Sequence, residues 1–75
     1  MENPITLAIE NFHRKYGVKP EVEMIRDGVE AEKVIIANLP GAKRKAFIQF
    51  HGATGEILGW GWIIPSGRAA LEPGI

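Results

Sequence analysis

The sequence contains no cysteine, which excludes disulfide bridges and thiolate metal ligands and suits a reducing compartment. It has no long apolar run either, so no segment approaches the roughly 20 residues that a membrane-spanning helix needs. The first four residues lack a basic stretch followed by an apolar one, and we expect no secretion signal. These absences predict a soluble, cytoplasmic protein that does not associate with membranes.

The chain also has no net charge and few side chains of the kinds that form catalytic or metal sites. Lys and Arg together number nine, as do Asp and Glu, so the net charge is zero, which disfavours strong nonspecific binding to phosphate backbones. The only histidines, His13 and His51, lie far apart and have no metal-ligand spacing. No phosphate loop or nucleophile elbow is present. We therefore expect no enzymatic activity, no metal, no cofactor and no small-molecule substrate.

What the chain does have is the composition of one small folded domain. Its 75 residues are 45% hydrophobic, which fits a single domain over 1–75 with a modest core. Asn3 is a good N-cap, Pro4 suits the first helical position, and Gly17 suits the left-handed position after a helix. Apolar residues recur between them at three- and four-residue spacing. The spacing predicts a helix over 4–16.

Four later segments predict strands. Residues 21–26 alternate polar and apolar, which predicts a half-buried strand with Val22 and Met24 inward. Asp27-Gly28 predicts a two-residue hairpin turn before a return strand that contains 34–37. Further strands are expected over about 44–51 and 56–64.

The last ten residues, 66–75, predict one helical turn at 68–71 within a flexible tail. The predicted fold class is α+β: an N-terminal helix packed on an antiparallel sheet of three or four strands, with a short or absent C-terminal helix.

The densest functional signal is a cluster of basic and aromatic residues. Its members are Lys43, Arg44, Lys45, Phe47, His51, Trp60 and Trp62. Aromatic rings stack on bases and cations hold the phosphate backbone in single-strand binding sites. The tryptophans share one strand face because side chains alternate, and this face is either a core wall or an exposed platform. Gly59 and Gly61 lie on the opposite face, and we expect the helix to approach there and leave the tryptophans uncovered.

Several motifs resemble the double-stranded RNA-binding domain family. Residues 3–7 are similar to the Pro-x-x-Leu opening of its first helix, 16–23 to its helix-to-strand passage, and 59–61 to its Gly-x-Gly. Residues 66–70 lie where its second helix begins, although Gly67 and Arg68 stand in place of the family's two lysines. The resemblance implies a helix on an antiparallel sheet, RNA as the partner, and Arg68 as a phosphate contact.

The sequence thus favours a non-enzymatic module that binds nucleic acid, most of all RNA, through its basic-aromatic surface. The predicted phosphate contacts are Lys43, Arg44, Lys45 and Arg68, with Trp60 and Trp62 as stacking groups beside Phe47 and His51. The alternative is a protein-interaction or inhibitory module that dimerises or docks through the Trp60/Trp62 face, since exposed apolar patches and tryptophans mark protein interfaces.

Overall fold

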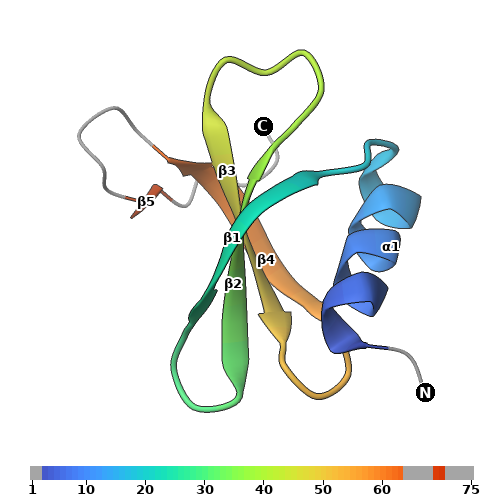
Figure 1. The fold of residues 1–75 in the computed structure, drawn as a ribbon, viewed down its shortest axis with the longest axis vertical. Coiled ribbons are helices and arrows are strands. Elements are labelled where there is room, and N and C mark those ends of the chain that lie inside the picture. The colour runs from blue at the N-terminus through green and yellow to red at the C-terminus, as the bar shows by residue number, and fades with distance from the viewer. Residues whose placement is uncertain (1–2, 64–68, 71–75) are drawn as a thin grey trace.

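A helix followed by a meandering antiparallel sheet makes up the computed structural model (Figure 1). It describes residues 3–63 and 69–70. The elements are α1 (Pro4–Tyr16), β1 (Glu21–Asp27), β2 (Glu32–Asn38), β3 (Lys45–His51), β4 (Ile57–Ile63) and β5 (Ala69–Ala70). Each strand pairs with the next along the chain, in the order β1-β2-β3-β4-β5. The predicted α+β class with an N-terminal helix is confirmed.

The bounds of α1 follow from its end residues. The Asn3 side chain accepts a hydrogen bond from the Ile5 N–H at 2.8 Å, which satisfies one of the free donors at the helix start. Gly17 has φ of 80° and donates its N–H to the His13 carbonyl at 2.8 Å, as a left-handed C-terminal residue does. The helix predicted over 4–16 is confirmed.

The core lies between α1 and one face of the sheet. Ile35 pairs with Ile48 and Ala37 with Ala46 across β2 and β3, and all four side chains are fully buried. From α1, Ala8 and Phe12 complete the centre of the core, which extends to Leu39 and Phe50. We call this side of the sheet the helix face and the opposite side the open face.

A β-bulge changes the expected orientation of β1. The register shifts between Val22, which pairs with Ala37, and Met24, which pairs with Ile36. The extra residue, Glu23, reverses the alternation of side chains. Val22 therefore lies on the helix face and Met24 on the open face, and both stay exposed, at 39% and 42%. The prediction that both point inward is wrong.

Two local predictions also fail. Asp27 belongs to β1, where it pairs with Lys33 and its carboxylate lies 2.7 Å from the Lys33 Nζ. The connection to β2 therefore spans residues 28–31 rather than two residues, and Glu30 takes the left-handed conformation with φ of 56°.

The second failure is the helical turn expected at 68–71. Ala69 and Ala70 instead form β5 opposite Ile63 and Trp62, because β4 offers its free edge to them. Arg68 and Leu71 lie outside the described residues.

Two glycines with the same backbone conformation provide a test of how α1 sits on the sheet. Gly41 and Gly55 have φ of 80° and 79°, but only Gly55 is crowded: a Cβ there would lie 2.7 Å from the Leu7 Cβ. We expect Gly41→Ala to cost about 1–2 kcal/mol for its left-handed backbone. Gly55→Ala should cost at least about 1 kcal/mol more, from overpacking against α1. Urea unfolding of both variants measures the difference, and equal losses would contradict this packing.

Candidate nucleic-acid interface

The two tryptophans lie on the helix face. Trp60 pairs with Ile48 and Trp62 with Ala46, and the Trp60 ring meets the Phe12 ring edge-on with centroids 5.5 Å apart. Tyr16 of α1 adds a second contact to Trp60 at 5.6 Å. The prediction that the helix would approach the glycine face is therefore wrong. The helix packs on the row with the largest apolar side chains, because burying aromatic area stabilises the fold most.

Phe47 is separated from the tryptophans by the sheet itself. It pairs with Gly61, and its neighbour Gln49 pairs with Gly59, so these residues lie on the open face. Phe47 is only 5% exposed there. A single surface that joins Phe47 to both tryptophans is therefore not formed.

His51 lies apart from the basic loop. It ends β3, at the opposite end of that strand from Lys45. Its Nδ1 accepts a hydrogen bond from the Ala53 N–H at 3.1 Å, which ties the ring to the β3–β4 turn. The remaining sequence-based candidate, Arg68, lies outside the described residues.

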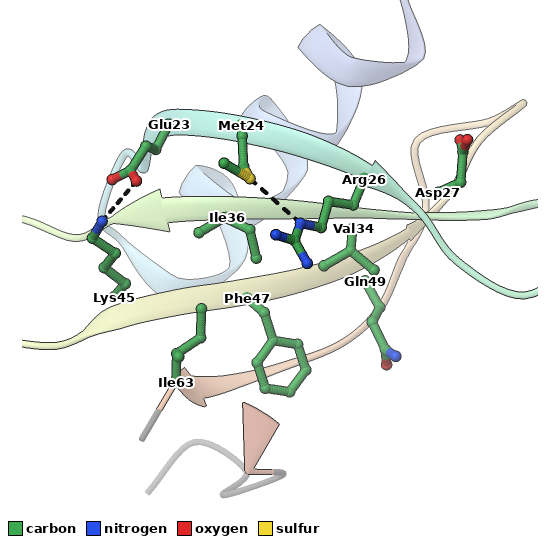
Figure 2. A pocket seen from close by; sticks show the side chains of 10 residues that line it. All are labelled: Glu23, Met24, Arg26, Asp27, Val34, Ile36, Lys45, Phe47, Gln49 and Ile63. Carbon is green, nitrogen blue, oxygen red and sulfur yellow. Dashed lines mark hydrogen bonds and ion pairs between the residues drawn. The ribbon is translucent and has the colours of Figure 1, made fainter. Parts of the chain in front are cut away.

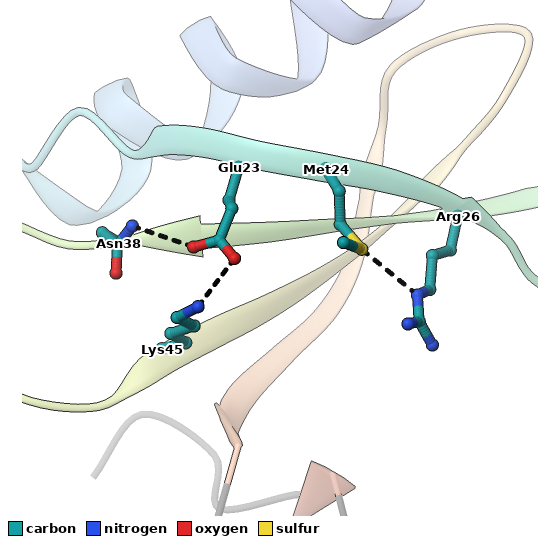
Figure 3. A network of polar contacts seen from close by, with 5 residues as sticks. All are labelled: Glu23, Met24, Arg26, Asn38 and Lys45. Carbon is teal, nitrogen blue, oxygen red and sulfur yellow. Dashed lines mark hydrogen bonds and ion pairs between the residues drawn. The ribbon is translucent and has the colours of Figure 1, made fainter. Parts of the chain in front are cut away.

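Lys45 is held by an ion pair on the open face. Its Nζ lies 2.6 Å from the Glu23 carboxylate, which also accepts a hydrogen bond from the Asn38 amide at 3.4 Å (Figure 3). The hydrogen bond from Lys45, aided by its charge, holds the pKa of the Glu23 carboxyl below the ordinary value of 4.5. Much of the Lys45 charge is therefore balanced within the molecule.

Three of the residues predicted to contact nucleic acid lie together in the structure. Lys43 and Arg44, in the loop between β2 and β3, line a shallow hollow of about 320 Å³ with Ala42 and Trp62. Both basic residues are exposed, whereas Trp62 is half-buried beside Trp60, with ring centroids 5.3 Å apart. The structure thus places two cations next to one partly accessible indole ring.

The topology also separates charges along the strands. The loop after α1 and the β2–β3 loop lie at the same end of the sheet, where β1 begins (Figure 1). Among the described residues of the sheet and its loops, this basic end carries Lys19, Lys43, Arg44 and Lys45 against Glu21 and Glu23. The opposite, acidic end carries Asp27, Glu30, Glu32 and Glu56 against Arg26 and Lys33. A chain with no net charge therefore has two oppositely charged ends.

A second surface was not anticipated from the sequence. The open face contains a groove of about 440 Å³, shown with its side chains in Figure 2. Its lining residues are Glu23, Met24, Arg26, Asp27, Val34, Ile36, Lys45, Phe47, Gln49 and Ile63. The signal for it was the continuous apolar run over 34–37, because a strand that is apolar on both sides is usually covered on both.

Comparisons with known proteins do not add to this description. No family model, no curated protein and no solved structure matches the chain. Within residues 3–63 and 69–70, no three His, Cys, Asp or Glu side chains gather as metal ligands would. None of the described helices is long and apolar enough to cross a membrane.

The Glu23–Lys45 pair predicts a pH effect with a definite sign. Because the folded-state pKa of Glu23 is lowered, the stabilisation from the pair is present above about pH 4.5 and is lost as the pH falls through the folded-state pKa. NMR titration of the Glu23 carboxyl should give a higher pKa in Lys45→Met than in the unchanged protein. The stability difference between the two proteins should also shrink from pH 6 to pH 3. A Glu23 pKa that stays the same in Lys45→Met would contradict the assignment.

Proposed function

We propose that this chain is a non-enzymatic module that binds single-stranded RNA at its basic end. The observation that carries the proposal is the hollow in which Lys43 and Arg44 stand beside Trp62. Cations that follow a backbone, next to a ring on which a base stacks, are the usual elements of a single-strand site. The absence of cysteine supports a cytoplasmic location for this activity.

Zero net charge is compatible with this site because the charges are separated in space. A seven-residue strand is roughly 23 Å long, whereas charges in water are screened over about 8–10 Å at physiological salt. A phosphate at the basic end therefore interacts with Lys19, Lys43 and Arg44 much more than with the distant acidic end. Since Glu23 balances Lys45, we assign the phosphate contacts to Lys43 and Arg44.

The accessible ring favours a single strand over a duplex. Base stacking on an aromatic side chain contributes about 1–3 kcal/mol per base, and bases within a duplex are not free to stack on it. Ala69 and Ala70 pair with β4 as a strand. They stand at the place in the sequence where the double-stranded RNA-binding domain family begins its second helix. We choose RNA over DNA on the resemblance of residues 3–7 and 16–23 to that family.

Charge reversal at the two ends of the sheet provides a matched test. Lys43→Glu with Arg44→Glu should weaken binding of a labelled single-stranded RNA at least tenfold, measured by fluorescence anisotropy. Because each lost phosphate contact removes about 0.7 from the slope of log K against log salt, the slope should flatten by about 1.4. The control, Arg26→Glu with Lys33→Glu, makes the same charge change at the acidic end and should have a much smaller effect.

The stacking role of Trp62 has its own readout. In a Trp60→Phe variant, Trp62 is the one remaining tryptophan, and its emission should be quenched as RNA binds. Parallel titrations with duplex RNA and with both forms of DNA establish the preference. If none of the four nucleic acids binds in a salt-sensitive way at low ionic strength, the proposal is wrong. If both charge-reversal pairs weaken binding equally, the basic end is not the site.

A further inference from the structure

A row of aromatic rings on the helix face leads away from the hollow at Trp62. The ring centroids of Trp62 and Trp60 are 5.3 Å apart, and those of Trp60 and Tyr16 are 5.6 Å apart. Tyr16 is the last residue of α1. The row therefore joins the hollow beside Lys43 and Arg44 to the C-terminal end of the helix.

Tyr16 is the most exposed ring of this row. It contacts Phe12, with centroids 4.6 Å apart, as well as Trp60. These contacts hold the Tyr16 ring in place, because Phe12 is fully buried and Trp60 is half-buried. Tyr16 itself stays 38% exposed. A ring that is held by its neighbours and open to solvent is suited to stacking, since little side-chain freedom is lost when a base binds.

Cations accompany Tyr16 as they accompany Trp62. The Lys15 Nζ lies 5.6 Å from the centroid of the Tyr16 ring, and Lys19 follows in the loop that leads to β1. This loop and the β2–β3 loop lie at the same end of the sheet (Figure 1). Lys15 shares a shallow hollow with Glu56 but forms no ion pair with it, and Lys19 forms none with any described residue. Both positive charges are therefore available to an anion.

We propose that the Tyr16 ring, with Lys15 and Lys19 beside it, is a second base-stacking subsite for single-stranded RNA. This subsite, which rests on the function proposed above, extends the binding site along the strand. A base that stacks on Tyr16 displaces the Lys15 Nζ, because an exposed cation–π contact is weaker than base stacking. The freed ammonium group and that of Lys19 then hold phosphates next to this base.

Two stacking rings at one end of the sheet define the kind of strand that binds. The ring centroids of Tyr16 and Trp62 both lie within 5.6 Å of the Trp60 centroid, so bases of one short segment reach both. The backbone of that segment crosses the basic end, from Lys43 and Arg44 to the end of α1. Affinity should therefore rise with RNA length up to about four nucleotides, the smallest usual site for single strands, and change little beyond.

Two substitutions of Tyr16 provide a matched test. Tyr16→Phe keeps the ring, whereas Tyr16→Leu keeps an apolar side chain without one. We expect Tyr16→Leu to weaken binding of an eight-nucleotide single-stranded RNA at least about fivefold in fluorescence anisotropy, because one base loses its stacking partner. Tyr16→Phe should stay within about twofold, and far-UV circular dichroism checks that both variants fold. Since Tyr16 is the only tyrosine of the chain, its ring-proton NMR signals also report directly on stacking and should move upfield as the RNA binds.

The two lysines are tested by salt dependence. Lys15→Glu with Lys19→Glu should flatten the slope of log K against log salt by about 1.4, since each lost phosphate contact removes about 0.7. The pair Arg26→Glu with Lys33→Glu, at the acidic end, is again the control and should change the slope much less.

The outcomes separate this subsite from the proposed function. If the eight-nucleotide RNA does not bind the unchanged protein, both are wrong. If it binds and responds to Lys43→Glu with Arg44→Glu, but Tyr16→Leu and Tyr16→Phe bind equally well, only the second subsite is wrong. If Tyr16→Leu does not fold, the tyrosine signals of the unchanged protein decide, and signals that stay in place as RNA binds would overturn the subsite.

Discussion

The contact between α1 and the tryptophan row is the interaction on which the rest of the structure depends. Phe12 meets Trp60 edge-on, and Tyr16 lies against both rings. In a 75-residue chain, few side chains are large enough to build a core, and aromatic rings provide the most apolar area per residue. Once α1 covers this row, the helix occupies one side of the sheet, and Phe47 and the groove beside it lie on the other.

The positions of the hollow beside Trp62 and of the groove around Phe47 follow from that division. Trp60 is held under α1, whereas Trp62 lies farther along β4, beside Lys43 and Arg44 of the β2–β3 loop. The same packing leaves Phe47 and the groove around it on the far side of the sheet. The hollow at the basic end and the groove on the open face are therefore separate surfaces.

The mixed outcome for the sequence-based predictions has identifiable physical causes. The helix at 4–16 was predictable because its end signals are local: the Asn3 cap and the left-handed Gly17 act within one turn. The orientation of β1 was not, because the bulge at Glu23 reverses the alternation on which the prediction for Val22 and Met24 rested. The hairpin turn was misplaced because Asp27, a common turn residue, is used in a cross-strand ion pair with Lys33.

The sequence by itself determined the helix, the first four strands, their order and the α+β class, since periodicity, caps and turn residues act over short distances. It also determined that Trp60 and Trp62 share a face. Only the tertiary structure decided which face of the sheet α1 covers. That outcome depends on which of the two faces, each built from distant segments, buries more apolar area under the helix. It likewise separated His51 and Phe47 from the basic loop and gathered charges of one sign at each end, because antiparallel pairing sets which loops meet.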